Sequence, residues 1–224
     1  MNFAAILFDF DGVLIESEAV GSREIAATLT ALGYPTRYEE AITRFNGLAD
    51  IAFLKAVEEW IGGPIPPAFH QMRAELVSAD GETIEEVAGA IAFVRSLPSS
   101  LPVAVVSSSS VEWIDRHLRS IGLRDRFGPH LYSGRTHVTR GKPAPDLYLH
   151  GADRLGVPIT ECVVLEDSVV GATGAVASGA TVIGLCAGTH CLTDHDQRLR
   201  ATGVHHIAGS FDEVRALVGL PPNT

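Results

Sequence analysis

The sequence predicts a doubly wound α/β domain, with a parallel sheet covered on both faces, and a small all-helical domain inserted after the first strand. Four short apolar runs without polar alternation indicate strands buried on both faces. They span residues 5–8, 103–106, 162–165 and 181–185. Helical periodicity separates the last three runs, and strand–helix alternation of this kind implies right-handed βαβ crossovers.

Composition places the chain among ordinary globular proteins. Its 224 residues are 46% hydrophobic and 20% charged, which argues against intrinsic disorder. With 17 basic against 27 acidic residues, the formal net charge of −10 argues against a nucleic-acid-binding surface but permits a small anionic substrate. No apolar run approaches the roughly 20 residues of a membrane span, and no signal peptide is expected.

The three cysteines predict free thiols rather than a disulfide framework. Cys162, Cys186 and Cys191 form no CxxC pair and are odd in number. We therefore expect buried, reduced thiols and a cytoplasmic setting.

The inserted region follows the first strand and shows helical periodicity but no convincing strand. Three helices are expected, over residues 25–32, 51–61 and 67–78, the first two ended by Gly and Pro residues. Residues 78–81 are typical of a linker, and the capping-box spacing of residues 83–86 predicts a helix that ends near residues 97–98. We expect residues 1–15 and 82–224 to form the α/β core and residues 16–81 the helical domain.

Three further helices and a closing strand–helix pair complete the predicted core. Apolar residues share one helical face over residues 111–121 and 147–155, and glycines follow both segments. Residues 169–178 combine a helical pattern with small residues that permit close packing on a sheet. Residues 204–218 are typical of a short strand followed by an amphipathic helix.

Two carboxylates follow the first predicted strand. Asp9 and Asp11 stand two residues apart where the strand ends, and Gly12 permits a sharp exit of the chain. Strand alternation would aim both side chains the same way, and two like charges so placed need a cation or a shared proton. Ligands bind at this edge of open α/β sheets, although Asp-x-Asp-Gly alone fits a solvated turn equally well.

A second acidic pair makes a metal site the stronger interpretation. Glu166 and Asp167 also follow an apolar strand directly. Together with Asp9 and Asp11 they would form an oxygen-rich site suited to Mg²⁺.

A serine run and a rigidly presented lysine are candidate phosphate ligands. Ser107 and Ser108 come directly after a predicted strand and before a helix N-terminus, where hydroxyl and amide groups can hold a phosphate. Ser109 fits a helix cap and a ligand contact equally well. Lys142 lies in a proline-rich segment, and near acidic strand ends it could bind phosphate and balance the carboxylates.

Together these motifs resemble those of the haloacid dehalogenase-like (HAD) superfamily of phosphotransferases, with its Rossmann-like core. The residues that carry the resemblance are Asp9, Asp11, Ser107, Lys142, Glu166 and Asp167, in the family's order. The β-phosphoglucomutase-like and sugar-phosphate phosphatase branch is the most similar. The resemblance implies that the helical insertion is a cap domain.

The resemblance implies a mechanism. Asp9 would attack phosphorus to form an aspartyl-phosphate, and Asp11 would act as general acid and then general base. Mg²⁺ would be held by Asp9, the carbonyl of Asp11 and Asp167, with Glu166 acting through water. Ser107 and Lys142 would bind the phosphoryl oxygens that are not transferred.

Departures from related branches favour a phosphatase. Asp11 argues against a dehalogenase. Gly21 stands where the sugar-phosphate mutases carry a histidine, and the cap loop lacks their Lys-Gly-x-x-Arg pattern. A phosphonate-cleaving relative would need a lysine of the insertion to form a Schiff base. Lys55, the lysine of the insertion, is expected to be a solvated helix residue instead. A phosphosugar mutase and a non-enzymatic binding protein remain the alternatives.

The expected partner is a small phosphorylated metabolite, without nucleic acid or membrane, and the expected state is a monomer or weak homodimer. Substrate choice is expected to lie in the cap loop of residues 44–47. There Arg44 could meet a carboxylate or second phosphate, and Asn46 a sugar hydroxyl, although an arginine is more often exposed.

Two histidines and two tryptophans are not assigned to the site. His190 and His195 follow the last long strand and could border the site, but the preferred interpretation is that they are exposed loop residues, whereas Trp60 and Trp113 are interpreted as helix packing residues.

Overall fold

The computed structural model describes the backbone of residues 3–48, 50–80 and 84–221. The chain divides into two compact units, Met1–Glu16 with Glu85–Thr224 and Ser17–Ile84. Among the described residues, none of the helices combines the length and apolar character that a bilayer crossing needs.

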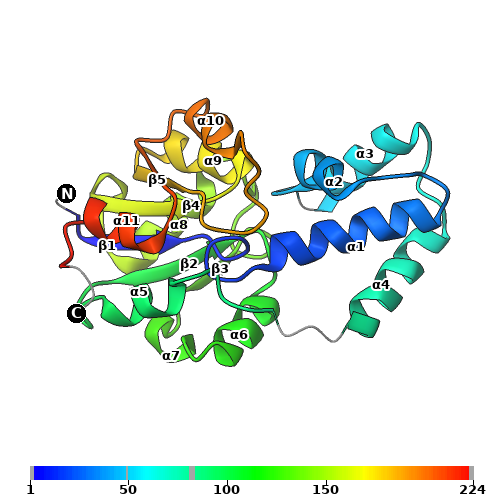
Figure 1. The fold of residues 1–224 in the computed structure, drawn as a ribbon. Helices are drawn as coiled ribbons and strands as arrows, with labels where there is room; N and C mark the ends of the chain where they lie inside the picture. Colours follow the sequence, from blue (N-terminus) through cyan, green and yellow to red (C-terminus); the bar gives the residue numbers. More distant parts are fainter. Residues whose placement is uncertain (1–2, 49, 81–83, 222–224) are drawn as a thin grey trace. The chain divides into compact units, whose positions relative to one another are not determined.

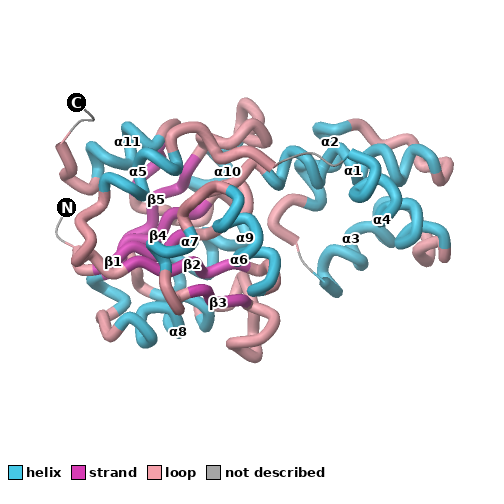
Figure 2. Tube along the Cα trace, turned by 90° about the horizontal axis from the view of Figure 1, so that it is seen from below, coloured by secondary structure: helices cyan, strands magenta, loops and turns pink. Residues whose placement is uncertain are grey.

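The first unit is built on a six-stranded, fully parallel sheet of order β3-β2-β1-β4-β5-β6 (Figures 1 and 2). The strands are β1 (Ala5–Phe8), β2 (Val103–Ser107), β3 (Leu131–Ser133), β4 (Cys162–Glu166), β5 (Thr181–Leu185) and β6 (His206–Ala208). The four apolar runs in the sequence are therefore strands, and the predicted doubly wound fold is confirmed.

Helices cover both faces of this sheet (Figure 1). They are α5 (Ala90–Ser96), α6 (Val111–Ser120), α7 (Arg124–Phe127), α8 (Asp146–Leu155), α9 (Val169–Ser178), α10 (His195–Arg200) and α11 (Phe211–Leu217), with a short 3-10 turn at Ile159–Glu161. The predicted helices after β2, before β4 and after β4 are present, as is the closing strand–helix pair. The sequence interpretation missed α7 and α10.

Strand alternation divides the core between the two faces. On one face Leu7 and Val164 belong to an apolar cluster with Leu147 of α8 and Ala175 of α9. On the other, the Phe8 ring packs edge-on against the aromatic rings of α5 and α7, at 6.2 and 5.7 Å between ring centroids. Burial on both faces explains why these strands have no polar alternation.

The predicted start of α5 is wrong. The capping-box pattern placed a helix from residue 83, which lies outside the described residues, whereas α5 begins at Ala90. Glu86 instead forms an antiparallel bridge with Ile15, and its carboxylate accepts a hydrogen bond from the backbone N–H of Ile91 at 2.6 Å. Pairing with a segment 71 residues away in the chain overrides the local capping signal.

The edge strand β3 was missed because its three residues are too few to show a pattern. It pairs with β2 through the register Val105↔Leu131 to Ser107↔Ser133. Its position comes from that pairing and not from local propensity.

The described residues of the second unit form four helices, α1 (Ser17–Ala31), α2 (Tyr38–Phe45), α3 (Asp50–Ile61) and α4 (Ala68–Asp80). Its apolar centre includes Ile25, Leu29, Phe45, Val57 and Phe69. Three of these helices are those that the sequence predicts, whereas α2 was not predicted. Residues 44 and 45, expected to belong to a loop, form the last turn of α2. The helix α4 continues to Asp80, beyond the expected linker start at residue 78.

Candidate active site

The strand order places the acidic motifs at the centre of the sheet. The chain winds from β1 outward to β2 and β3, and then from β4 on the other side of β1 to β5 and β6. Phe8 is in register with Leu165, and the backbone N–H of Asp9 donates to the carbonyl of Leu165 at 3.0 Å. The two acidic pairs therefore meet at the switch point, where α/β sheets bind ligands.

A buried lysine joins two carboxylates from different strands. Lys142 Nζ lies 2.7 Å from Asp9 Oδ1 and 2.5 Å from Glu166 Oε1, and all three side chains are at least nine-tenths buried. Burial alone would lower the pKa of Lys142, but the charges of Asp9 and Glu166 outweigh it and raise that pKa. Burial and the charge of Glu166 raise the pKa of Asp9. The lysine is therefore a fixed cation.

The carboxylate of Glu166 is surrounded by protein donors. Besides Lys142, the hydroxyl of Tyr148 donates to Oε1 at 2.7 Å, and the backbone N–H and hydroxyl of Ser168 donate to Oε2 at 3.3 and 3.2 Å. A Cβ at Gly171 would lie 2.0 Å from Glu166 Oε1, so only glycine leaves room for this carboxylate. Glu166 is therefore held rigidly and turned toward Lys142.

Asp167 is also buried, but unlike that of Glu166 its carboxylate is not surrounded by hydrogen-bond donors in the part of the chain that the structure describes. It is 1% exposed, and neither carboxylate oxygen has a hydrogen-bond partner among the described residues. His190 Nε2 lies 2.8 Å from its Oδ2, but that contact is not aligned as a hydrogen bond. Burial and then the charge of Glu166 raise the pKa of Asp167. A Cβ at Gly12, whose φ is +77°, would lie 2.2 Å from Oδ2.

These carboxylates fit a divalent ion. Asp9, Glu166 and Asp167 each offer an oxygen within 4.8 Å of the others, and all three residues are buried. Buried carboxylates are normally paired with hydrogen-bond donors or with a cation. Because neither oxygen of Asp167 has a donor among the described residues, a cation is the partner that fits. Oxygen donors of this kind suit Mg²⁺. The side chain of Asp11 is not part of this group, and the ligand predicted from this residue is its backbone carbonyl.

Asp11 is held instead by hydroxyl and indole donors. Ser107 and Ser109 donate to its Oδ2 at 3.3 and 2.6 Å, and Trp113 Nε1 donates to its Oδ1 at 3.0 Å. Trp113 therefore does more than pack against its helix, where its ring lies 4.1 Å from that of His117, because its indole N–H also binds Asp11. The helix cap of α6 is Ser110, which accepts from the Trp113 backbone N–H, and this leaves Ser109 to bind Asp11.

The structure brings Ser107 to the carboxylates and shows a different contact for Ser108. Ser107 is 1% exposed, and its hydroxyl also accepts from the backbone N–H of Ser109 at 3.0 Å. The carbonyl of Ser108 accepts from Arg135 Nε at 3.1 Å. Arg135 therefore lies beside the serine loop, although the sequence did not indicate it.

Arg44 and Asn46 belong to the helical unit and are described within it. Arg44 is exposed, with its guanidinium 4.3 Å from the ring centroid of Trp60. Asn46 is half-buried, and its Oδ1 has no partner among the described residues. Trp60 packs in this unit and donates from Nε1 to Thr36 Oγ1 at 2.8 Å, as expected of a packing residue.

The interpretation of His190 and His195 as exposed is wrong. They are 0% and 4% exposed, respectively. His195 Nε2 lies 2.6 Å from the carbonyl oxygen of Asp167. Burial lowers the pKa of both imidazoles, that of His190 to about 4. The loop that carries them packs against Asp167, directly after β4. No local sequence pattern predicts this long-range contact.

The three cysteines are free, as expected, but differ in burial. Cys162 is buried, and burial raises the pKa of its thiol to about 11. Cys186 and Cys191 are only partly buried, so the expectation of burial is confirmed for one thiol alone.

A doubly wound sheet with buried carboxylates and a buried lysine at its switch point is typical of an α/β enzyme, and this acidic group is the candidate active site. Comparison with known proteins gives the family. The model of the haloacid dehalogenase-like hydrolases matches residues 3–179, and the chain belongs to this family.

The similar proteins include phosphatases. The 6-phosphogluconate phosphatase of Escherichia coli K12 is 29% identical over 188 residues, which cover 83% of this chain and 84% of the relative. Hexitol phosphatase A of the same organism is 32% identical, over 82% and 83% of the two chains. A HAD family hydrolase of Deinococcus radiodurans R1, solved with bound phosphate and sodium, is 32% identical with a TM-score of 0.83, over 99% of both chains. The protein is therefore a phosphatase of the HAD-like family.

Proposed function

We propose that the protein is a Mg²⁺-dependent phosphatase that hydrolyses a small phosphorylated metabolite, a sugar phosphate or a related phospho-acid, through an aspartyl-phosphate. One observation carries the proposal: carboxylates from two distant motifs converge with a buried lysine at the switch point of the sheet. The named activities of the relatives on phosphorylated sugars and sugar acids support the substrate class.

The side chains that would hold the ion are Asp9 and Asp167. The oxygens of Glu166 are occupied by protein donors, so this residue would reach the ion only through water. When bound, Mg²⁺ supplies the positive charge that offsets the repulsion between a phosphate dianion and an anionic nucleophile.

Asp9 would be the nucleophile, attacking phosphorus in line while the bond to the leaving oxygen breaks. Lys142 already donates to Asp9 at 2.7 Å, and it would hold that carboxylate and meet a phosphoryl oxygen beside it. Ser107 would donate to another phosphoryl oxygen.

Asp11 would move the protons. It would give one to the leaving oxygen and then take one from the water that attacks the aspartyl-phosphate. Its three donors orient the carboxylate, and Ser109 and Trp113 thereby gain a positioning role beside the reacting group.

The helical unit is proposed to act as a cap that excludes water and selects the substrate. Arg44 and Asn46 are its candidate substrate contacts. The choice among sugar phosphates would rest on such contacts, because the core residues recognise only the phosphoryl group.

Phosphate release from p-nitrophenyl phosphate and from a panel of sugar phosphates tests the proposal. We expect turnover only with Mg²⁺, no turnover by Asp9→Asn, and normal turnover by Asp153→Asn, which changes an exposed carboxylate of α8. Activity that survives Asp9→Asn would refute the assigned nucleophile. Conversion of β-glucose 1-phosphate to glucose 6-phosphate would instead favour a mutase, and tight binding without turnover a binding protein.

A further inference from the structure

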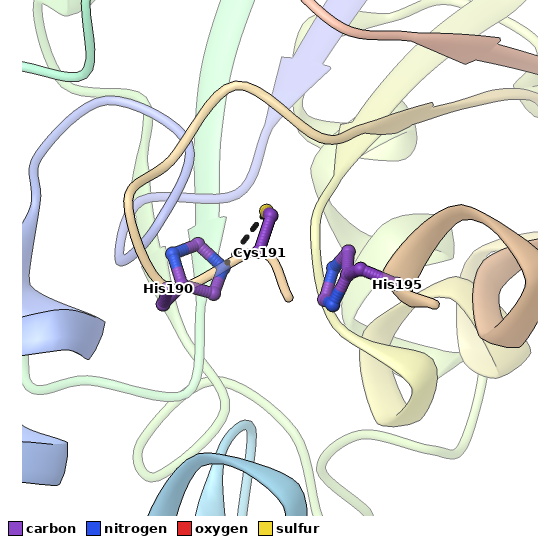
Figure 3. A group of neighbouring side chains, drawn as sticks. All are labelled: His190, Cys191 and His195. Carbon is purple, nitrogen blue, oxygen red and sulfur yellow. Dashed lines mark hydrogen bonds between the residues drawn. The ribbon is translucent and has the colours of Figure 1, made fainter. Parts of the chain in front are cut away.

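Beside the acidic centre, the loop between β5 and α10 gathers a second group of metal-binding side chains. His190 and Cys191 are adjacent in this loop, and His195 is the first residue of α10 (Figure 3). One donor atom from each lies within 4.8 Å of the other two. The proposed phosphatase chemistry uses none of these three donors.

The distances fit a small tetrahedral ion. His190 Nε2 lies 3.6 Å from Cys191 Sγ, the contact drawn in Figure 3. Bonds of about 2.1 Å to nitrogen and about 2.3 Å to sulfur, at a tetrahedral angle, place those two donors roughly 3.6 Å apart. The two donors therefore need little movement to share one ion.

Both histidines are buried, and His195 has a ring nitrogen without a partner among the described residues. His190 is 0% and His195 4% exposed, and Nδ1 of His195 has no hydrogen-bond partner in the described part of the chain. Buried polar atoms are usually paired. His195 Nε2 also lies 2.6 Å from the carbonyl oxygen of Asp167, so it can donate there. A metal-bound histidine usually makes such a bond with its other nitrogen, which leaves Nδ1 of His195 for an ion.

We propose that His190, Cys191 and His195 form a binding site for Zn²⁺ with donors distinct from those of the oxygen-rich site for Mg²⁺, which it adjoins where His190 Nε2 lies 2.8 Å from Asp167 Oδ2. Two imidazoles and one thiolate are nitrogen and sulfur donors, which select Zn²⁺ over Mg²⁺. Three protein ligands leave a fourth position for water. Binding would tie the loop after β5 to the start of α10, next to Asp167. The site does not depend on the proposed phosphatase activity.

Co²⁺ is the probe that separates the two sites. The reduced, metal-stripped full-length protein is titrated with Co²⁺ in a large excess of Mg²⁺, which occupies the carboxylates. A thiolate-to-cobalt charge-transfer band is expected at one equivalent, and stoichiometric Zn²⁺ should abolish it. The carboxylate group contains no sulfur ligand and cannot produce this band.

Variants assign the ligands. Cys191→Ser should lose the charge-transfer band, and His195→Gln should weaken Co²⁺ binding at least about tenfold. Cys162→Ser, which changes a buried thiol at the start of β4, should retain both band and affinity. Circular dichroism confirms the fold of each variant, and His195→Gln decides the case if Cys191→Ser does not fold.

Three outcomes would overturn the site: a wild-type titration without the band, a band that persists in folded Cys191→Ser, or unchanged Co²⁺ affinity in folded His195→Gln. Loss of phosphatase activity enters none of these readouts, so failure of the zinc site and failure of the proposed function are distinguishable.

Discussion

Glu166 and Asp167 are adjacent, and both are buried, but the regions around them are built differently. Around Glu166, the donors Lys142, Tyr148 and Ser168 saturate the carboxylate. Around Asp167, no described donor forms a hydrogen bond to either oxygen. Burying a carboxylate without a partner costs free energy, so the two regions point to different tasks. The first holds a lysine in place, and the second is ready for a ligand.

The largest effect should come from removing the shared cation of the first region. Lys142→Met leaves Asp9 and Glu166 buried beside each other without their ion pair, and we expect a loss of about 3–5 kcal/mol in the free energy of unfolding. Urea denaturation measures it. Lys55→Met is the control, because Lys55 forms an exposed pair with Glu59 at 3.8 Å and should cost less than about 1 kcal/mol. Equal losses in the two variants would contradict a structural role for the buried pair.

The second prediction separates the two acids. Asp167→Asn should raise the Mg²⁺ concentration for half-maximal binding by at least about tenfold, because it removes a proposed ligand. Glu166→Gln should change that concentration less but lower the free energy of unfolding without metal, because it weakens the network around Lys142. Calorimetric titration with Mg²⁺ and urea denaturation measure the two quantities. The reverse pattern would show that Glu166 binds the ion and that Asp167 has the structural role.

The third prediction concerns the phenol behind Glu166. The hydroxyl of Tyr148 lies 2.7 Å from Glu166 Oε1 and 2.9 Å from the carbonyl oxygen of Gly171. Tyr148→Phe removes a hydrogen bond to a charged group, and we expect a loss of about 1.5–3 kcal/mol in the free energy of unfolding. Tyr34→Phe, in the helical unit, is a comparison variant with the same chemical change. If Tyr148→Phe changes the stability no more than this variant does, the network does not depend on the phenol.

The sequence predicted the parts of the site that stand at the ends of strongly patterned strands. Asp9 and Asp167 follow continuous apolar runs, and parallel pairing brings such strand ends to one edge. The position of Lys142 was harder to predict, because a long segment carries it to the sheet. Its role could be inferred only from the combination of motifs.

The rest of the site depends on contacts that no local pattern records. The face of α6 that carries Ile114 and Leu118 is evident from periodicity, but the bond from Trp113 to Asp11 joins residues 102 positions apart. His190 and His195 are polar residues in a loop, and only folding of that loop onto Asp167 buries them. Sequence reasoning assigns exposed positions to such residues because polar loop residues usually face water.

The smallest effect expected is the pH dependence of the stability that Tyr148 supplies. Burial, and then the charges of Glu166 and Asp9, raise the pKa of Tyr148 above its ordinary value of about 10. The unfolded chain then loses the phenol proton at lower pH than the folded chain does. The stabilising contribution is therefore complete below about pH 10 and declines as the pH rises toward the folded-state pKa. The difference in unfolding free energy between wild type and Tyr148→Phe should be constant from pH 7 to 9 and shrink above pH 10, as followed by urea denaturation. A difference that grows in alkali would mean that the phenol binds Glu166 in another protonation state.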